Sequence, residues 1–466
     1  MKFSSIKHIH FIGIGGIGMS GIATILKHQG YTISGCDIDI HQKSVLDLTA
    51  IGCTVYHGNN TAACYDHTID LIVYSSAIDN TNPEILAAQQ RGIPTIQRAV
   101  MLADLMRTKF SIAVAGAHGK TTTTSMIAHI LREAALDPTI IVGGYLENIS
   151  KQAHLGTSEL LVAEADESDR SFLKLFPVMA VITNIDLEHV DVYRDLEDII
   201  ATFAQFLRQL PFYGTAFVCT DNEAVRTLLP LHYIKTIRYG TTEDADIRAS
   251  EIRLYPEYAE CVIEDCVAQS VLGLIRIPMP GIHNVLNATA AVAVARALEV
   301  PFSVIVQALS SFAGIERRFS FKGIYNGVEI FDDYGHHPTE IEYTLRVATQ
   351  RAKGRVIVAF QPHRYSRTEQ LMQQFVTVLK QHPIDQLIIT DIYPAGEVHR
   401  PGLTAALVDA CMQYQGVYDV PICYMPSETT WDSLRAYLAS ITEPNDLILF
   451  LGAGKLNKAA ELLVKQ

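Results

Sequence analysis

The chain has 466 residues, of which 48% are hydrophobic and 19% charged, so it carries more apolar material than one core needs and is expected to form two to four globular domains. A formal net charge of −13 and a pI of about 5.7 argue against a broad phosphate-neutralising surface and thus against nucleic acid as a partner. The eight cysteines form no C-x-x-C pair and no zinc-type spacing with histidine, which is typical of a protein of the reducing cytoplasm.

Targeting and membrane signals are absent from the sequence. The N-terminus has no apolar core followed by a small-residue cleavage site, and no run of about 18 or more apolar residues occurs. We therefore expect a cytoplasmic protein without export or membrane insertion.

The first part of the chain reads as one nucleotide-binding unit. Strands are expected at 8–16, 32–38, 70–76 and 93–97, with helices at 18–29 and 83–91. This alternation of strands and helices is the pattern of βαβ units with a mostly parallel sheet. The predicted fold class is therefore α/β, beginning with a Rossmann-like domain.

The glycine motif "GIGGIGMSG" (13–21) follows the first strand and opens a helix, and Asp37 ends the next strand. Such a turn lets a pyrophosphate approach the backbone at a helix N-terminus. The motif alone fits NAD, a nucleotide sugar or an ordinary glycine turn.

Two further series of strands follow. The second is expected at 110–116, 159–166, 179–185 and 214–220; residues 236–282 then predict a small antiparallel or mixed sheet, followed by a helix at 284–298. The third has strands at 327–334, 355–362, 386–393 and 446–454. We place domains at 1–106, 107–313 and 314–466, the central one like a P-loop ATPase and the last Rossmann-like.

The stretch "AGAHGKTTTT" (115–124) lies where a strand gives way to a helix, so backbone N–H groups and the helix dipole converge on one spot. Gly116 and Gly119 permit close backbone approach, Lys120 can reach the outer phosphates of a nucleotide, and the hydroxyl of Thr121 can bind Mg²⁺. A strict P-loop has an earlier glycine where this chain has Val114, so we interpret the stretch as a shortened triphosphate loop.

Acidic and basic side chains gather at other strand ends. "LLVAEADESDR" (160–170) carries Glu164, and "VITNIDLEHVD" (181–191) carries His189. Carboxyl ends of parallel strands are where α/β sheets bind ligands, which favours a metal–nucleotide site over solvated surface. "IFDDYGHHPTE" (330–340) and "FQPHRYSRT" (360–368) place histidines and arginines likewise, and arginines can hold a small carboxylate substrate.

Taken together, "GIGGIGMSGIA", "AGAHGKTTTTSM", "EADESDRSFL", "TNIDLEHVD", "GIHNVLNATAA", "ERRF", "DDYGHHPTE" and "FQPHRYSRT" resemble the Mur ligase family, in order, from about residue 8 to residue 455. The resemblance implies three domains, for UDP-sugar, ATP and amino acid. It implies that ATP phosphorylates the lactyl carboxylate of UDP-N-acetylmuramate and that the amine of L-alanine attacks the acyl phosphate, releasing phosphate. It also implies Mg²⁺, with Mn²⁺ as a substitute, and a monomer or homodimer.

The resemblance assigns site residues by motif. For ATP it implies Gly116, His118, Gly119, Lys120, Thr121, Thr122, Asn284, Asn287, Arg318, and Asp332 or Asp333 at the ribose, with Thr121, Glu164 and His189 as Mg²⁺ ligands. For the UDP-sugar it implies Gly13, Gly15, Gly16, Gly18, Met19, Ser20, Asp37 and Ser75. For the amino acid it implies Tyr334, His336, Arg364 and Arg367. Lys120 and His336 are the candidate catalytic residues, His336 as the group that assists loss of the amine proton.

The chain departs from the family pattern at Ala117, where relatives commonly have threonine, and in 143–156, which lacks an expected glycine–asparagine step. Three alternatives remain open: an NAD-dependent oxidoreductase, a non-catalytic UDP-sugar or ATP sensor, and a ligase that attaches a recycled peptide to the same sugar nucleotide.

Overall fold

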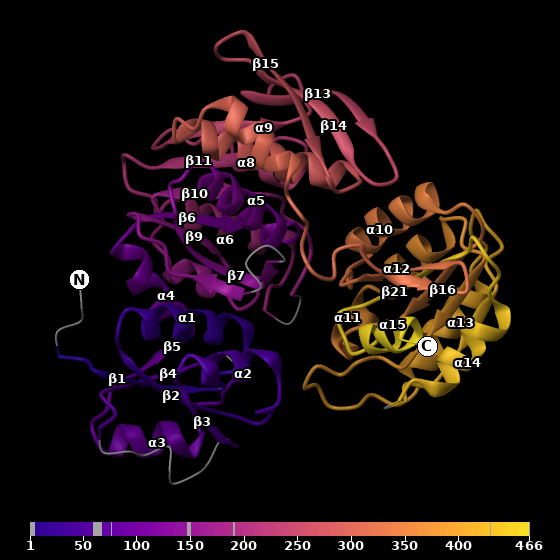
Figure 1. The fold of residues 1–466 in the computed structure, drawn as a ribbon, viewed down its shortest axis with the longest axis horizontal. Coiled ribbons are helices and arrows are strands. Elements are labelled where there is room, and N and C mark those ends of the chain that lie inside the picture. The colour runs from indigo at the N-terminus through magenta and orange to yellow at the C-terminus, as the bar shows by residue number, and fades with distance from the viewer. Residues whose placement is uncertain are drawn as a thin grey trace. The chain divides into compact units, whose positions relative to one another are not determined.

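The computed structural model describes residues 5–58, 68–75, 77–146, 151–189, 192–428 and 430–465, and three sheets organise this part of the chain (Figure 1). The chain divides into two compact units. The first comprises Met1–Ile252, Glu260–Pro278 and Asn284–Ala313, and the second Arg253–Ala259, Met279–His283 and Gly314–Gln466. The predicted α/β class with three sheet-centred parts is confirmed.

The first sheet has the strand order β3-β2-β1-β4-β5, and its pairings are parallel. Its elements are β1 (His8–Ile12), α1 (Ile17–His28), β2 (Thr32–Asp37), α2 (Lys43–Ala50), β3 (Thr54–His57), β4 (Leu71–Tyr74), α3 (Pro83–Gln90), β5 (Thr95–Gln97) and α4 (Arg98–Arg107). From β1 the chain proceeds to β2 and β3 on one side of the sheet and then to β4 and β5 on the other side. The glycine turn after β1 therefore lies at the point where the direction of strand order switches, which is where such sheets bind ligands.

The second sheet has ten strands in the order β15-β14-β13-β12-β11-β10-β6-β9-β7-β8. Its strands are β6 (Phe110–Ala115), β7 (Thr139–Leu146), β8 (Lys151–His154), β9 (Leu160–Glu164), β10 (Met179–Ile182), β11 (Thr215–Cys219), β12 (Lys235–Gly240), β13 (Ile247–Leu254), β14 (Ala259–Asp265) and β15 (Ser270–Ile277). Its helices are α5 (Lys120–Glu133), the 3₁₀ turn η2 (Ser171–Lys174), α6 (Leu196–Leu207), α7 (Glu223–Arg226), α8 (Ile282–Ala297) and α9 (Phe302–Ser310).

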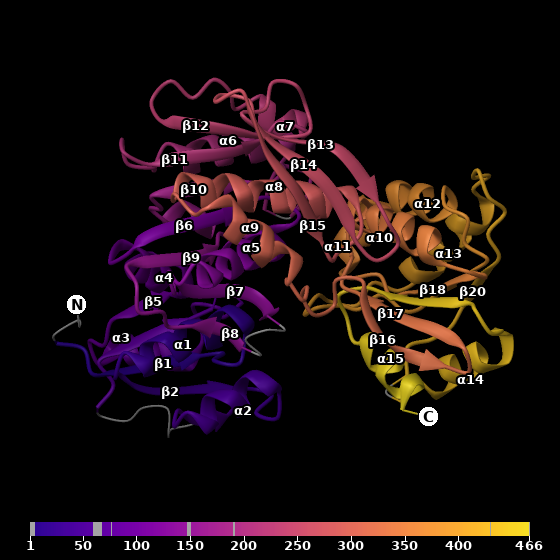
Figure 2. The ribbon, with the colours of Figure 1, turned by 45° about the horizontal axis from the view of Figure 1, so that its top comes forward.

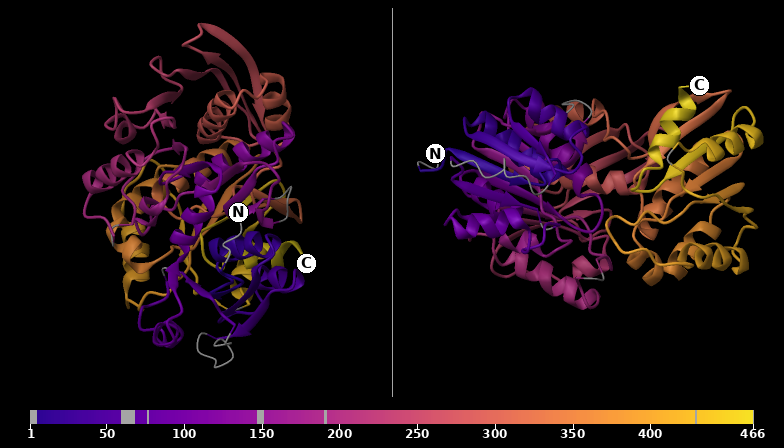
Figure 3. Two further views of the ribbon diagram at one scale, coloured as in Figure 1. Left: turned by 90° about the vertical axis from the view of Figure 1, so that its left-hand side faces the viewer. Right: turned by 90° about the horizontal axis from the view of Figure 1, so that it is seen from below.

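The separate small sheet expected at 236–282 is instead an extension of this central sheet. Its strands are labelled in Figure 2, and Figure 3 gives two further views of the ribbon. β12 pairs in parallel with β11 from Lys235 to Tyr239, which continues the ladder without a break, and β13 to β15 add to it. The alternating sequence of β13 to β15 reflects strands with one exposed face, whereas β6, β10 and β11 are buried because helices cover both their faces.

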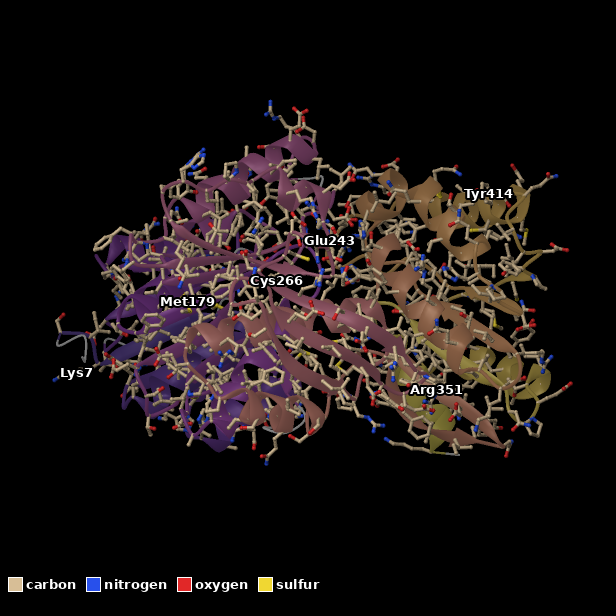
Figure 4. All side chains as sticks on the ribbon, turned by 90° about the horizontal axis from the view of Figure 1, so that it is seen from above. Lys7, Met179, Glu243, Cys266, Arg351 and Tyr414 are labelled. Atoms are coloured by element: carbon tan, nitrogen blue, oxygen red, sulfur yellow. The ribbon has the colours of Figure 1, made fainter. Side chains whose placement is uncertain are left out.

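One hydrophobic core joins the first two sheets. The cluster runs from Phe11 and Met19 through Met106 and Ala163 to Phe206. Helix α1 lies against β7 and β8 at the edge of the central sheet (Figures 1 and 2), and Figure 4 places Met179, at the start of β10, among the packed side chains of this unit. The first two sheets therefore share one compact unit.

The second unit holds a six-stranded sheet in the order β16-β17-β21-β18-β19-β20. Its elements are β16 (Ser320–Tyr325), β17 (Val328–Asp333), α10 (Pro338–Arg351), β18 (Val356–Phe360), α11 (Tyr365–Gln370), α12 (Met372–Lys380), β19 (Gln386–Ile389), α13 (Leu403–Gln413), β20 (Ile422–Tyr424), α14 (Asp432–Ile441), β21 (Leu447–Leu451) and α15 (Asn457–Val464). β16 runs antiparallel to β17, and the other pairings are parallel.

Helices cover both faces of this sheet (Figure 2). Val356, Val358 and Phe360 of β18 pack in the cluster that includes α10, α12 and α13, and Ile357 and Ala359 pack on the opposite face with α14 and α15. This two-residue alternation, buried on both sides, explains why the sequence of β18 is an uninterrupted apolar run.

None of the described helices is long and apolar enough to cross a membrane.

Phe206 and Phe212 offer a test of the shared core. Phe206 of α6 is fully buried and its ring centroid lies 4.8 Å from that of Phe172, whereas Phe212 is 90% exposed. Because truncation of a buried aromatic leaves a cavity, Phe206→Ala should lower the free energy of unfolding by about 3–5 kcal/mol in chemical denaturation. Phe212→Ala is the control and should stay within about 0.5 kcal/mol of the parent protein; equal effects would contradict the packing.

Candidate active site

The loop between β6 and α5 depends on two glycines with positive φ. Gly116 has φ 140° and Gly119, which caps α5, has φ 80°. A Cβ at Gly116 would lie 2.0 Å from the hydroxyl oxygen of Thr183, and one at Gly119 would lie 2.5 Å from Oδ1 of Asn287. The neighbouring elements therefore touch the loop so closely that side chains do not fit.

The end of β10 supports this loop with side-chain hydrogen bonds. The amide oxygen of Asn184 accepts the His118 N–H at 2.8 Å, and its amide nitrogen donates to the His118 carbonyl at 2.9 Å. The hydroxyl of Thr183 donates to the same carbonyl at 2.7 Å, and His118 Nε2 lies 3.1 Å from a carboxylate oxygen of Asp186. The loop is thus held in one conformation.

Lys120 lies beneath the loop. Its ammonium donates to the carbonyls of Gly116 and Ala117 at 2.6 and 3.0 Å and to Oε1 of Glu167 at 2.9 Å. Burial alone would lower the pKa of Lys120, but the adjacent carboxylates, Glu167 above all, raise it above its usual value. Lys120 is therefore a cation throughout the physiological range.

Two sets of candidate metal ligands lie near Lys120: Glu164 with Thr121, and His189 with Glu167 and Glu188. The first is Glu164, whose carboxylate accepts hydrogen bonds from the Thr121 hydroxyl and the Gly143 N–H; burial raises its pKa. The second is His189, whose Nε2 lies 3.4 Å from a carboxylate oxygen of Glu167 and 3.4 Å from one of Glu188.

These carboxylates have capacity for a cation. Oε1 of Glu164 and Oε2 of Glu167 are buried and have no hydrogen-bond partner within the described ranges. Ligand atoms of Glu167, Glu188 and His189 also all lie within 4.8 Å of one another. Buried acceptors without donors are costly, and carboxylate oxygens are the ligands that Mg²⁺ prefers, so the residues present fit that ion.

The first turns of α5 meet α8. Oδ1 of Asn287 accepts from the Thr123 hydroxyl at 3.1 Å, and the Asn287 amide donates to Oδ1 of Asn284 at 3.4 Å. Thr122 is also buried. The structure thus brings both asparagines, expected at the adenine, next to the phosphate loop, although more than 150 residues separate them from it in sequence.

The N-terminal glycine turn is held by Asp37. Its Oδ2 accepts the Gly15 N–H at 2.8 Å, and its Oδ1 accepts from the Asp39 N–H and the Gln42 amide at 3.0 Å each. Gly13 has φ 75°, and Gly18 would place a Cβ 2.4 Å from a guanidinium nitrogen of Arg98. The Asp37 carboxylate therefore holds the glycine turn in place through its own hydrogen bonds.

The remaining residues expected at the UDP-sugar differ in exposure. Gly16 has room around it, with the nearest atom 3.5 Å from an added Cβ. Met19 and Ser20 are buried, Met19 in the core and Ser20 with its hydroxyl donating to the Ile17 carbonyl at 3.0 Å. Ser75 lies in the turn after β4, where its hydroxyl oxygen accepts the Ala77 N–H at 3.1 Å.

A cavity of about 410 Å³ opens beside that turn in the first unit. It is lined by Tyr74, Ile78, Asp79, Asn80, Gln97, Asp169, Ser171 and Lys174. These residues come from the ends of β4 and β5 and from the segment after β9, so both sheets of the unit contribute to one polar hollow. Its volume is within the range of small-molecule sites.

In the second unit, the strand end of β17 is a dense charged cluster. Asp332 pairs with Arg317 at 3.1 Å and has a pKa raised to about 6 by burial. Asp333 accepts the N–H groups of Phe319 and Gly335 at 2.7 Å each, and Arg318 pairs with Glu340 at 3.2 Å. Both aspartates expected at the ribose therefore already pair with or accept hydrogen bonds from groups of this unit.

The residues expected around the amino acid lie together in this unit. The rings of Tyr334 and His336 have centroids 5.4 Å apart, and those of His336 and His363 are 5.6 Å apart. A guanidinium nitrogen of Arg367, in α11, lies 3.4 Å from Nδ1 of His363, and Arg364 directly precedes this short helix. Burial and then the charges of His336 and the two arginines lower the pKa of His363 to about 3.

Sequence reasoning assigned no individual role to four residues that support these sites, although one of them stands among the acidic residues expected near a metal: Glu167, which is that residue, Asn184, Arg317 and Glu397. Glu167 and Asn184 stood in strand-end motifs, but nothing in the sequence distinguished them from their acidic or polar neighbours. Arg317 belongs to the quoted "ERRF", where Arg318 was chosen instead. No local pattern pointed to Glu397.

Three family models match the chain in order: the Mur ligase family catalytic domain at residues 8–110, the Mur ligase middle domain at 114–295, and the Mur ligase glutamate ligase domain at 317–454. The chain belongs to the Mur ligase family.

Curated relatives extend over the full chain. The UDP-N-acetylmuramate–L-alanine ligase of Acidobacterium capsulatum is 46% identical over 464 residues, covering 100% of this chain and 98% of the relative. The enzyme of the same name from Syntrophotalea carbinolica is 44% identical over 463 residues, covering 99% and 98%.

Solved structures agree on the fold. The UDP-N-acetylmuramate–alanine ligase of Thermotoga maritima matches with a TM-score of 0.80 and 25% identity, covering 99% of this Mur ligase and 98% of that chain. A murein peptide ligase from Psychrobacter arcticus matches with a TM-score of 0.74 at 24% identity, covering 98% of each chain. The MurF ligase of Thermotoga maritima in complex with ADP matches with a TM-score of 0.64 at 16% identity, covering 100% and 99%.

Asn184→Ala tests the support of the phosphate loop. The substitution removes two hydrogen bonds to the backbone of His118, each contributing about 1 kcal/mol. Amide hydrogen exchange across 116–119 should therefore accelerate by at least about tenfold, measured by mass spectrometry. Asn82→Ala is the control, because Asn82 caps the distant α3 through the Glu84 N–H; it should leave exchange at 116–119 unchanged, and an unchanged rate in Asn184→Ala would refute the role.

Proposed function

We propose that this Mur ligase joins L-alanine to the lactyl carboxylate of UDP-N-acetylmuramate in peptidoglycan precursor synthesis, using ATP and passing through an acyl phosphate. The observation that carries the proposal is the Lys120 ammonium beneath a glycine loop at a helix N-terminus, beside Thr121 and Glu164. Relatives that bear this activity's name are 44–46% identical over the whole chain, which supports the same acceptor and amino acid here.

The loop and Lys120 are proposed to hold the triphosphate. N–H groups at the start of α5 and the helix dipole favour phosphate oxygens. Lys120 already lies within reach of the loop carbonyls and would exchange contacts with Glu167 for the β- and γ-phosphates. Gly116, His118, Gly119 and Thr122 form the rest of this cradle. A fixed cation there offsets the repulsion between the triphosphate and the approaching carboxylate.

Magnesium ions are proposed at the two carboxylate groups. Thr121 and Glu164 would hold one, and His189 with Glu167 and Glu188 the other; Mn²⁺ would serve in their place. When bound, the ions neutralise charge on the phosphate oxygens during transfer.

The reaction proceeds in two displacements. A lactyl carboxylate oxygen attacks the γ-phosphorus, the bond from that phosphorus to the β,γ-bridging oxygen breaks, and ADP leaves. The alanine nitrogen then attacks the acyl carbon, the bond from that carbon to the phosphate oxygen breaks, and phosphate leaves with the electron pair. Alanine enters as an ammonium and loses one proton before it attacks, for which His336 is the proposed acceptor; the second proton passes to the departing phosphate as the amide forms.

Binding of the other substrate groups is proposed by motif. Asn284 and Asn287 would contact adenine, with Arg318 and Asp332 or Asp333 near the ribose, and Tyr334, Arg364 and Arg367 would surround alanine. The UDP-sugar would bind at Gly13, Gly15, Gly16, Gly18, Met19, Ser20, Asp37 and Ser75, and the nearby cavity offers space for part of it. Domain limits of 1–106, 107–313 and 314–466 follow this division of ligands, and the cytoplasm, which holds ATP, is the proposed location.

The full-length match to alanine ligases disfavours an NAD-dependent oxidoreductase or a non-catalytic sensor. A ligase that attaches a recycled peptide is the nearest rival, since a murein peptide ligase shares the fold. The deciding experiment measures phosphate release with ATP, Mg²⁺ and UDP-N-acetylmuramate against a panel of L-alanine, glycine, L-serine and the tripeptide. Release that depends on L-alanine supports the proposal; release only with tripeptide, or none, rejects it.

Lys120→Ala should abolish amide formation, by at least about a thousandfold in kcat, because the triphosphate loses its fixed cation next to Glu167. Binding of UDP-N-acetylmuramate, measured by calorimetry, should change by less than about twofold, since its proposed site lies at the first sheet. Lys109→Ala, which removes a lysine that donates to the Ser158 carbonyl outside the loop, is the control and should retain activity. Equal loss of sugar-nucleotide binding and catalysis in Lys120→Ala would contradict the division of sites.

A further inference from the structure

The turn that follows β18 contains a residue in a backbone conformation that favours glycine. Arg364 has φ 71° and ψ 133°, and directly after it begins α11. Such a conformation is unfavourable for a non-glycine residue and persists only where neighbouring groups hold it. The Arg364 N–H donates to the Tyr393 carbonyl at 2.8 Å, which fixes one side of the turn.

Glu397 holds the other side. One of its carboxylate oxygens accepts from Nε of Arg364 at 3.0 Å and from the Ser366 hydroxyl at 2.5 Å, and the second accepts the Ser366 N–H at 3.1 Å. The Tyr365 N–H also bonds to this carboxylate. A single side chain therefore binds three consecutive residues at the strained turn.

Glu397 is itself anchored and ionised. Its N–H donates to the Pro394 carbonyl at 2.9 Å in a turn that contains Gly396 with φ 89°. Partial burial opposes ionisation, but the Ser366 hydrogen bonds and the charge of Arg364 together lower the pKa of Glu397. The carboxylate is thus a fixed negative charge at neutral pH.

The turn sets the position of the cationic cluster. Nε is the innermost nitrogen of the guanidinium, so bonding it to Glu397 fixes the plane in which the outer nitrogens can meet a carboxylate. One helical turn further, Arg367 contacts His363, and His363 lies against His336. Small displacements of Arg364 would therefore misplace the group proposed to receive the amino-acid carboxylate.

We propose that Glu397 is a positioning residue for amino-acid selection: it holds Arg364 so that its guanidinium receives the carboxylate of the incoming amino acid. This inference rests on the proposed function, in which Arg364 contacts L-alanine.

The test is steady-state kinetics of the full-length enzyme with Glu397→Gln, varying L-alanine, ATP and UDP-N-acetylmuramate in turn. The amide keeps the shape of the side chain but loses the charge that orients Arg364. The KM for L-alanine should rise at least tenfold, while the KM values for ATP and UDP-N-acetylmuramate stay within twofold. Glu397→Asp, which keeps the charge on a shorter stem, should show a smaller rise.

Glu369→Gln is the matched control. Glu369 lies on α11, the helix that follows Arg364, and pairs with the exposed Arg400. Removing its charge should therefore leave all three KM values unchanged. If Glu397→Gln fails to fold, as judged by thermal unfolding, Ser366→Ala replaces it; this variant removes one hydrogen bond to Glu397 and should raise the L-alanine KM about threefold.

A double-mutant comparison separates positioning from simple helix capping. In an Arg364→Ala background, Glu397→Gln should raise the L-alanine KM by no more than a further twofold, because the group that it positions is gone. Equal rises in all three KM values, or a full additional tenfold rise in the double variant, would overturn the inference. Absence of L-alanine-dependent phosphate release in the unsubstituted enzyme would instead reject the proposed function.

Discussion

The buried ammonium of Lys120 is the interaction on which the candidate site depends. Glu167 bonds to it directly, Glu188 and Asp166 add negative potential, and the loop carbonyls of Gly116 and Ala117 complete its surroundings. Carboxylates gathered at this density would repel one another without a cation among them. The same density leaves buried acceptor oxygens that one lysine does not satisfy. A triphosphate would add to this negative charge, so the arrangement is suited to a nucleotide that arrives with divalent cations.

Strand order is what assembles this charge cluster. β6 lies between β10 and β9, so three motifs separated along the chain leave the sheet at adjacent carboxyl ends. The glycine loop follows β6, the acidic run that holds Glu167 follows β9, and the segment from Thr183 to His189 follows β10. Parallel neighbours point their carboxyl ends the same way, so the segments that follow these strands meet at one edge of the sheet. The packing of the apolar strands thus sets the positions of their carboxyl ends, and polar residues that follow the strands are brought together there.

This logic also explains how far sequence alone could go. Uninterrupted apolar runs such as β6 and β18 predicted buried parallel strands, and the motifs after them marked where ligand groups belong. Half-exposed short strands such as β3 were missed because their sequences alternate weakly, and β12 was assigned to a separate sheet because pairing with β11 is a long-range property. The role of Glu397 could not be predicted from sequence, because its hydrogen-bond partner Ser366 lies 31 residues away in the chain and no local motif links the two.

The two glycine turns of the first unit differ in the charged groups that surround them. At the first turn, the Asp37 carboxylate accepts the Gly15 N–H, so one loop donor is already used and a negative charge lies beside it. At the second, the loop carbonyls and carboxylates surround a cation, Lys120, and no acidic side chain takes the N–H groups at Gly119 or Lys120 in the described hydrogen bonds. The Asp37 carboxylate can accept hydrogen bonds from hydroxyl or amide groups, whereas the carboxylates around Lys120 call for divalent cations before a polyphosphate can bind beside them. These surroundings fit the proposed division of ligands, with the UDP-sugar at the first turn and the triphosphate with its divalent cations at the second.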